Sequence, residues 1–382
     1  MKIVIRLILI SSLFGMFQKV AFGQAATSAV PFLLVAPDSR AGGIGESGAG
    51  LADNSAAIFW NPAGIAFLTG SEVSITHSNW LPQFNLDLFY DYLTYRQYIE
   101  SLSGSITSSI TYMNYGEFVR TSPDSPDAIG TFKSFDAAMT LGYATKLSND
   151  WGIGMNFRVI HSVLSTQPTA GEQGSGVATS VSFDLATMWR PSSFDIPFIG
   201  DLGKKFSVGA NLSNLGPKMY YIDQAQADPI PTNFRLGFAY ELVNDEYNSL
   251  MYTFDVSKLL VDKDSTTSKD FYQAIFTTWS KYPFFRSMDY SMGLEYWYGQ
   301  PGDFLFALRT GFFYEDPAFG NRKFMTFGAG IRYDIYGFDF SYISTSIFPG
   351  GAENPLSDTL RFSVLIGWGG IVGQSRGLPK GI

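Results

Sequence analysis

The stretch FLFALRTGFFYE, residues 304–315, decides the fold, because its side chains alternate between apolar and polar with a period of two. One face carries large apolar side chains, which are Phe304, Phe306, Leu308, Phe312 and Tyr314. The opposite face carries Arg309 and Gly311. Successive side chains of a β-strand point to opposite sides, so the pattern predicts a strand with one apolar and one polar face. The same alternation recurs in FDAAMTLGYATKL (135–147), WGIGMNFRVIHS (151–162) and LRFSVLIGW (360–368).

The composition places such strands in a membrane. Charged residues make up 16% of the chain, as do aromatic residues, whereas ordinary globular domains contain roughly 25% charged residues. After residue 23 there is no run of 18 apolar residues, which excludes a transmembrane helix. A soluble β-sandwich also alternates, but its outer face is the polar one. We therefore predict an all-β fold, a transmembrane antiparallel β-barrel.

The first residues indicate export. Lys2 and Arg6 precede the apolar run Leu7–Phe17, and Ala21-Phe22-Gly23 offers a cleavage site, so residues 1–23 are predicted to be a signal peptide. Its removal leaves 23 basic and 34 acidic residues, a net charge near −11. This balance argues against binding to nucleic acid. The chain has no cysteine, which excludes disulfides and thiol chemistry.

Fourteen segments show strand-like patterns, and an even number is what bacterial single-chain barrels require. They are 71–80, 86–95, 105–113, 135–147, 151–163, 177–189, 206–213, 233–243, 249–258, 290–298, 304–314, 324–334, 337–345 and 359–368. We thus expect a plug over residues 24–70, a barrel over 71–368 and a C-terminal tail over 369–382.

The predicted connections alternate in length, which orients the barrel. Long connections are expected at 114–134, 164–176, 214–232, 259–289 and 346–358. Short ones fall between them, at 148–150, 244–248, 299–303 and 335–336, with medium ones at 190–205 and 315–323. Outer-membrane barrels have short periplasmic turns and long extracellular loops. Within 259–289, Phe271, Ile275 and Trp279 at helical spacing after a Ser268 cap predict an amphipathic helix. It would be either a lid on its own barrel or a docking site for a partner.

The stretch DNSAAIFWNPAGIAF, residues 53–67, breaks the alternation. Asp53 or Asn54 can cap a helical turn that must end before Pro62, and Pro62 can begin a second turn. The segment is too apolar for solvent and too short to be stable alone. We expect it to fill the barrel lumen, with a plug formed by Asp53, Asn54, Phe59, Trp60, Asn61, Pro62 and Ala63. The upstream GIGESG, residues 43–48, matches a dinucleotide-binding pattern, but no βαβ unit follows, so we assign it to the plug.

Charged residues on the polar strand faces should point into the lumen. They are Asp136, Arg158, Asp184, Arg235, Glu241, Asp255, Glu295, Arg309, Arg332, Asp339 and Arg361. Buried charges must be paired or solvated, so they form either a salt-bridge lattice that holds the plug, which we favour, or a permeation path. His77 and His161 are the only histidines, and neither has metal-ligand or Ser/His spacing nearby. We therefore expect no enzyme activity, no metal and no cofactor.

The head AVPFLLVAPDSRAGGIGESGAGLADNSAAIFWNPAGIAFL, residues 29–68, resembles the N-terminal hatch of FadL-type outer-membrane barrels. Three later pieces are more specifically similar to the PorV (LptO) family of the Bacteroidetes type IX secretion system. These are FDVSKLLV (254–261), GFFYEDPAFGNRKFMTFGAGIRYDIYGFDFSYI (311–343) and NPLSDTLRFSV (354–364).

The resemblance implies a non-enzymatic outer-membrane shuttle. Its partners would be a giant SprA- or Sov-like translocon barrel, the C-terminal signal domains of secreted cargo, a PorU-like attachment complex and outer-membrane lipid. Exposed aromatic residues are favoured binding anchors, so the expected cargo contacts are Met219, Tyr220, Tyr221, Phe271, Trp279 and Phe348. The alternative is a FadL-like transporter of hydrophobic small molecules, which predicts a ligand-sized apolar pocket beside Phe59 and Trp60.

Overall fold

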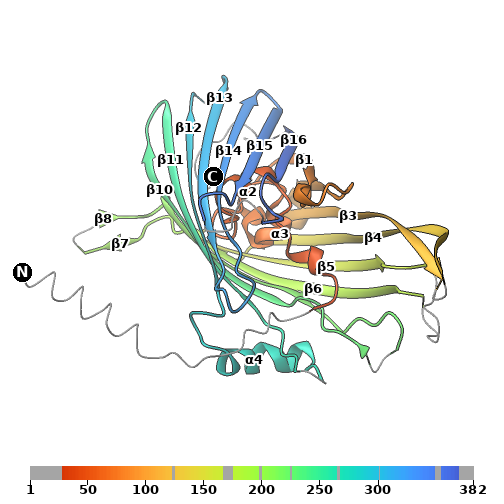
Figure 1. Ribbon diagram of the computed structural model, residues 1–382. Helices are drawn as coiled ribbons and strands as arrows, with labels where there is room; N and C mark the ends of the chain where they lie inside the picture. The colour runs from red at the N-terminus through yellow and green to blue at the C-terminus, as the bar shows by residue number, and fades with distance from the viewer. Residues whose placement is uncertain are drawn as a thin grey trace, which may run out of the picture.

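The barrel is closed by fourteen antiparallel strands (Figure 1). The computed structural model describes residues 28–122, 125–166, 175–197, 200–223, 226–264, 267–300, 302–348 and 354–369. The predicted signal peptide and all but the first residue of the predicted tail lie outside the described residues. Neighbouring strands pair in chain order, and the first strand pairs with the last from Ser71↔Trp368 to Asn79↔Leu360. The predicted fold class is confirmed.

Each predicted segment corresponds to one barrel strand. The strands are β1 (Ser71–Asn79), β2 (Phe89–Ile99), β3 (Gly104–Ser122), β4 (Ser125–Lys146), β5 (Trp151–Val163), β6 (Val177–Trp189), β9 (Phe206–Leu215), β10 (Asn233–Asn244), β11 (Asn248–Leu259), β12 (Asp289–Tyr298), β13 (Leu305–Tyr314), β14 (Lys323–Tyr333), β15 (Tyr336–Ser344) and β16 (Leu360–Trp368). The short helical turns η3 (Pro82–Phe84) and η4 (Glu100–Leu102) lie in connections on opposite ends of the barrel.

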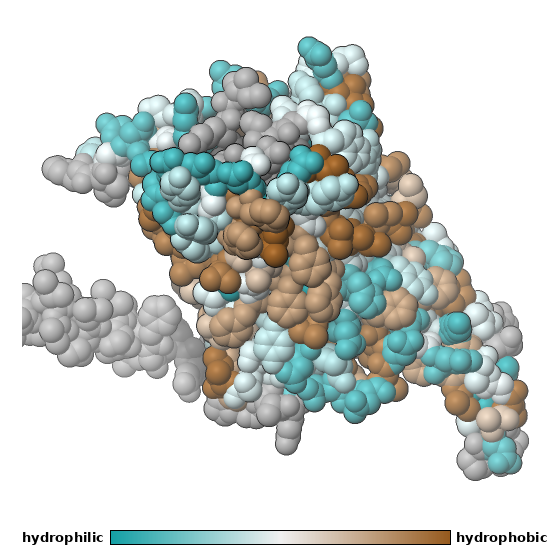
Figure 2. Space-filling view, turned by 90° about the horizontal axis from the view of Figure 1, so that it is seen from above, coloured by the Kyte–Doolittle hydropathy of each residue, from teal (hydrophilic) through white to brown (hydrophobic). Residues whose placement is uncertain are grey.

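The period-two pattern separates the outer wall from the lumen. In β13 the outward Leu308 is 65% exposed, while the inward Leu305, Ala307 and Arg309 are buried. An exposed apolar wall with charges inside is the reverse of a soluble sandwich and suits contact with lipid. Figure 2 shows hydrophobic residues across the middle of the visible face, between hydrophilic areas above and below.

The expected long loop 114–134 is wrong, because β3 and β4 continue through it as a hairpin that projects beyond the barrel (Figure 1). Their pairing resumes at Glu117↔Lys133 after a bulge at Gly116, where φ is +86°. Phe118 and Phe132 stack across it with ring centroids 5.6 Å apart. Beyond the barrel both faces of the hairpin meet a similar environment, so the apolar–polar alternation that predicts strands is lost while the backbone pairing persists.

Two other connections differ from the prediction. The connection 190–205 contains a small hairpin of β7 (Asp195–Ile196) and β8 (Gly200–Asp201). The amphipathic helix α4 (Phe271–Lys281) is present, but Asp270 is its N-cap. Ser268 does not cap α4 because it lies in an isolated bridge with Lys263, and its carbonyl accepts from Lys218. No helix among the described residues has the length and apolar character needed to cross a membrane.

Residues 28–70, which we call the N-terminal segment, lie inside the barrel (Figure 1). The segment contains η1 (Pro31–Leu34), α2 (Ser39–Gly43), α3 (Ala57–Trp60) and η2 (Pro62–Phe67). Its apolar side chains form the main buried cluster together with inward residues of β2 to β6. The shortness of these helices agrees with a segment that is stable only between walls.

Inward glycines let the backbone of the N-terminal segment touch the barrel wall directly. A Cβ built on Gly293 of β12 would lie 2.3 Å from the carbonyl oxygen of Ile44, and one on Gly311 of β13 would lie 2.1 Å from the nitrogen of Gly45. Such distances leave no room for a side chain, so the wall and the segment fit each other at backbone level.

We predict that Gly293→Val displaces the N-terminal segment while the barrel still forms, because the new side chain overlaps backbone that cannot swing away. Limited proteolysis of the detergent-solubilised protein should then cut within residues 28–70. Gly130→Val is the matched control, since nothing lies within 4 Å of its Cβ position. An unchanged proteolytic pattern for Gly293→Val would contradict the close fit.

Candidate functional site

Arg40 of α2 joins the N-terminal segment to the barrel. Its Nε and one terminal nitrogen donate to Glu295 of β12 at 2.8 and 2.7 Å, and its other terminal nitrogen donates to Asp53 at 2.6 Å. Burial lowers the pKa of Arg40, but the two carboxylates outweigh burial and hold the pKa well above its usual value. The guanidinium therefore stays charged and binds the carboxylates of both Glu295 and Asp53.

The Arg40 contacts continue into a chain of alternating charges across the barrel wall. Glu295 also accepts from Arg309 at 2.7 Å, Arg309 donates to Asp339 at 2.8 Å, and Asp339 pairs with Arg332 at 2.5 Å. With Arg40 and Asp53 included, the chain of contacts contains three arginines and three carboxylates. The chain is neutral as a whole, which is what buried charges require.

Further polar contacts hold the N-terminal segment at other strands. Arg361 of β16 donates to Glu46 at 3.1 Å. Asp255 of β11 accepts from the backbone nitrogen of Ala49 at 2.8 Å, and Glu72 of β1 accepts from that of Ser55 at 2.7 Å. The segment is thus hydrogen bonded to strands β1, β11 and β16 of the barrel wall.

The residues expected to form the plug all lie in the N-terminal segment, but the expected cap is wrong. The N-cap of α3 is Ala56, which makes no side-chain cap bond. Asp53 does not cap the helix because its carboxylate is taken by Arg40. Asn61 instead caps η2, since its side chain accepts from the nitrogen of Ala63 at 3.0 Å.

Trp60 lies between opposite charges. Its indole nitrogen donates to Asp38 at 2.6 Å, and the guanidinium of Arg235 lies 4.7 Å from the centre of its ring. Phe59 contacts the Trp60 ring edge to face at 4.9 Å. Pro62 begins η2, as the sequence predicts.

The charged residues expected in the lumen occupy inward positions. Arg235 is half-buried, and the other ten are buried. Apart from the chain described above, Arg158 pairs with Asp184 at 2.8 Å, and Asp136 accepts from the hydroxyl of Tyr115 at 2.7 Å. Within the described part of the chain, these residues are thus held by ion pairs and hydrogen bonds.

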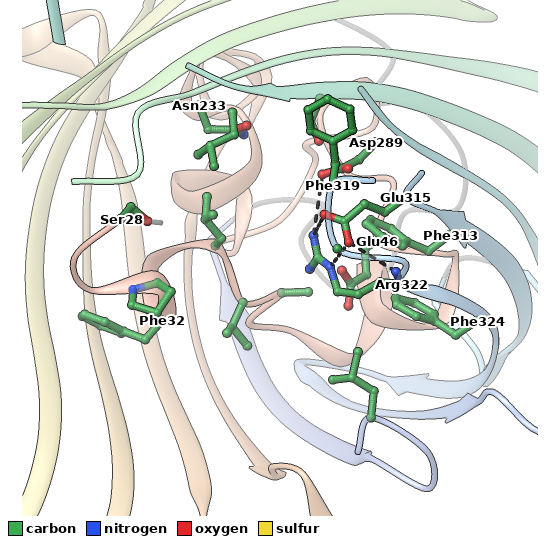
Figure 3. Close-up of a pocket in the computed structure, with 18 of the residues that line it drawn as sticks. Ser28, Phe32, Glu46, Asn233, Asp289, Phe313, Glu315, Phe319, Arg322 and Phe324 are labelled. Atoms are coloured by element: carbon green, nitrogen blue, oxygen red, sulfur yellow. Dashed lines mark hydrogen bonds and ion pairs between the residues drawn. The ribbon is translucent and has the colours of Figure 1, made fainter. Parts of the chain in front are cut away.

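A cavity of about 580 Å³ lies between the N-terminal segment and the long connections (Figure 3). Phe32 and Glu46 contribute to it from the segment. Arg322 reaches into it and bonds Glu315 at 2.9 and 3.1 Å, with Asp289 at 3.6 Å. Aromatic rings line much of the remainder, including Trp80, Tyr115, Tyr282, Phe313, Phe319 and Phe324.

The spaces beside Phe59 and Trp60 are much smaller. One is lined by Phe59 and Arg158, the other by Trp60 and Asp38, and each measures about 10 Å³. Each can hold about one water molecule. The ligand-sized cavity therefore lies on the long-connection side of the segment, not beside the predicted hatch residues.

The side chains expected to contact cargo differ in their exposure. Tyr220 is 54% exposed, whereas Met219 is buried and the other four are half-buried. Among these, the hydroxyl of Tyr221 donates to Ser162, and Trp279 contacts Phe234. Of this set, only Tyr220 presents most of its side chain outward.

Sequence reasoning did not single out Asp262, which ties down α4. Burial raises the pKa of its carboxyl, but hydrogen bonds from Lys269, Lys281 and Thr277 outweigh burial and lower the pKa to about 2. Lys269 lies 2.7 Å away and Thr277 donates at 2.5 Å. A lone aspartate in a loop carries no motif, so nothing in the sequence points to this role.

A family model described as type IX secretion system protein PorV matches residues 18–266, well over half of the chain. The chain belongs to the PorV family. It is therefore an outer-membrane β-barrel of the type IX secretion system, a family without enzymatic activity. The match includes the piece 254–261, whereas the similar pieces at 311–343 and 354–364 lie beyond it. No match was found among curated proteins.

Solved structures with a similar fold include channels for small hydrocarbons. The TodX deltaS2S3 mutant monoaromatic hydrocarbon channel has a TM-score of 0.51 at 10% identity, covering 86% of this chain and 97% of that chain. The Pseudomonas putida toluene transporter TodX has a TM-score of 0.49 at 9% identity, covering 86% and 96%. The Ralstonia pickettii toluene transporter TbuX has 0.44 at 10%, covering 87% and 98%. At these identities the likeness concerns the fold alone.

We predict that Arg40→Gln loosens the N-terminal segment of this PorV-family protein, because Glu295 and Asp53 each lose a buried partner. Breaking buried pairs of this kind costs about 3 kcal/mol. Amide hydrogen exchange should accelerate over residues 39–53 and stay unchanged in β3 and β4. Arg120→Gln, at an exposed position on β3, should leave exchange in residues 39–53 unaltered.

We also predict that Asp262→Asn releases α4, with amide exchange over residues 271–281 rising roughly thirtyfold if about 2 kcal/mol of charge-assisted bonding is lost. The depressed pKa means that the stabilisation is present above about pH 4 and disappears as the pH falls toward 2. Protection of α4 should thus be constant from pH 5 to 8. Asp264→Asn, an exposed site paired only with Lys281 among the described side chains, should have a much smaller effect.

Proposed function

We propose that this protein is a shuttle of the type IX secretion system. It would bind the C-terminal signal domain of secreted cargo at a SprA- or Sov-like translocon barrel and deliver the cargo to a PorU-like attachment complex at the cell surface. The observation that carries the proposal is the PorV family match together with a lumen filled by the ion-paired N-terminal segment. Because the lumen is filled, the extracellular rim is the surface that would bind folded protein.

The projecting part of the β3–β4 hairpin supports recognition of a protein partner. β2 pairs with β3 only as far as Asn114, and β5 pairs with β4 only from Phe135 onward. Among the described residues no third strand pairs with the extensions beyond these points. Free strand edges offer unpaired backbone groups, which is how β-strand addition recognises extended or β-sandwich partners.

Side chains at the rim would add anchors to this backbone recognition. Tyr220 is our leading candidate among the six expected cargo contacts, because most of its side chain faces outward. Met219 and Tyr221 would support the connection that carries it. Phe271, Trp279 and Phe348 stay hypotheses for contacts with cargo or translocon.

A second candidate function is transport of hydrophobic small molecules across the outer membrane. The 580 Å³ cavity lined by aromatic rings favours it, since ligand pockets commonly measure 300–1,000 Å³. The water-sized spaces beside Phe59 and Trp60 weigh against a path through the N-terminal segment.

Purification of the tagged protein from native membranes separates the two functions. The shuttle requires recovery of proteins that share a C-terminal signal domain, together with a giant barrel. If neither is recovered and a deletion strain takes up hydrophobic compounds poorly while secreting normally, the transport function replaces the shuttle.

We predict that deleting residues 117–132, which joins Gly116 to Lys133, abolishes recovery of cargo while the barrel keeps its heat-modifiable migration in gels. The matched control is the double substitution Val119→Ser and Ile129→Ser, which removes two exposed apolar side chains but keeps the hairpin backbone. Cargo recovery should survive the control if backbone edges carry recognition. Normal recovery after the deletion would exclude the hairpin as the cargo-binding element.

A further inference from the structure

Helix α4 contacts outward-pointing side chains at the end of the barrel wall that carries the long connections. Phe234 follows the inward Asn233 in β10, so its ring points outward, and it contacts Trp279 of α4 with centroids 5.9 Å apart. Lys258 of β11 follows the inward Ser257 and also points outward. Lys258 is nevertheless only 1% exposed. An outward residue can be buried only if something covers the wall, and here α4 and the turn after it provide the cover.

Among the described residues no carboxylate lies within ion-pair distance of Lys258, and the covering contacts stabilise its ammonium group instead. Its ammonium group donates to the hydroxyl of Ser287 and lies 5.5 Å from the ring centre of Trp279 and 5.9 Å from that of Tyr282. Cation–π contacts of this kind gain strength when the cation is desolvated. These contacts join α4 and the turn after it to the outward side of β11 near the end of the strand.

The sides of α4 have different environments. Ala274 and Thr278 are buried, and Trp279, on another side of the helix, contacts the barrel strands. Thr277 and Lys281 bond Asp262 of the preceding connection. The remaining side is exposed and carries Tyr272 and Phe276, with the polar Gln273 and Ser280 beside them.

The exposed aromatic surface comprises Tyr272, Phe276, Phe284 and Phe285, and we call it the aromatic face of the α4 region. Phe276 is 76% exposed. Trp279 connects this face to Phe284 at 5.9 Å, and Phe284 connects to Phe285 at 5.2 Å. Through Trp279 and Phe234 the face is continuous with the lipid-facing barrel wall.

We propose that the aromatic face of the α4 region is inserted into the outer leaflet of the membrane, at the boundary between headgroups and acyl chains. Its continuity with the lipid-facing wall supports this occupant, because a helix that contacts outward side chains at the edge of a barrel wall has lipid beside it. Amphipathic helices with large apolar residues on one face and polar residues on another lie in this boundary, where aromatic rings are favoured. Lys281, the one charged residue of α4, is already paired with Asp262 and Asp264, so hydrophobic insertion rather than charge holds the helix in place.

The inserted helix fixes one edge of the cavity mouth. The connection that carries α4 also contributes Tyr282 and Ser287 to the cavity lining, next to Asp289 at the start of β12. Anchoring in lipid sets the height of this edge relative to the membrane surface. The inference goes beyond the proposed function and holds whether the protein carries cargo or small molecules.

Site-directed spin labelling tests the proposal cleanly because the chain contains no cysteine. Phe276→Cys places a nitroxide on the aromatic face, and Gln273→Cys places one at the exposed polar position beside that face. Leu308→Cys on the barrel wall serves as the lipid reference. The purified labelled proteins are placed in liposomes of phosphatidylethanolamine and phosphatidylglycerol, and folding is checked by heat-modifiable migration.

We expect the Phe276 label to collide with oxygen several-fold more than with a water-soluble nickel chelate, as the Leu308 label does. The Gln273 label should show the reverse preference. A water-like response at Phe276 would overturn the proposal and leave the aromatic face free for a protein partner. Shielding of the Phe276 label from both reagents would also overturn it, because the face would then pack on the protein itself.

Discussion

The contact of Arg40 with Glu295 and Asp53 is the interaction on which the remainder of the structure depends. The inward faces of the strands carry charges that cannot stay unpaired in a dry lumen, since an isolated buried ion costs several kcal/mol. The N-terminal segment supplies Arg40 to Glu295 and Glu46 to Arg361. The wall and the segment therefore need each other, and a barrel without its segment would be left with unpaired charges.

Filling the lumen decides where function can reside. Glycines such as Gly293 and Gly311 bring the segment into backbone contact with the wall, so no space remains between the two at these positions. The cavity and the projecting β3–β4 hairpin both lie at the end with the long connections. A PorV-family protein built in this way divides into a filled barrel and an end that carries a cavity and a projecting hairpin. Such a division suits a protein that handles folded partners at the cell surface.

The membrane explains which parts of the fold the sequence could predict. All fourteen strands were predictable because lipid on one side and a filled lumen on the other impose alternation at every second residue. The alternation fails where lipid ends, so the extension of β3 and β4 and the β7–β8 hairpin were missed. Inward charges such as Arg309 were identifiable by register, but their partners were not, because pairing depends on how the N-terminal segment folds. Asp53 illustrates this, because its carboxylate pairs with Arg40 and does not cap the helix as expected.

The strand register also indicates which parts of the outer wall must be covered. Lys258 stands at an outward position of β11, where a charge facing lipid is unfavourable. Its presence in the sequence therefore required either a position at the membrane edge or a covering element. The structure contains the cover in α4, whose Trp279 and Tyr282 lie around the ammonium group. A charge in the lipid-facing register of a barrel strand is thus evidence for a loop that folds back onto the outer wall, and the aromatic residues of that loop then meet the same lipid as the strand they cover.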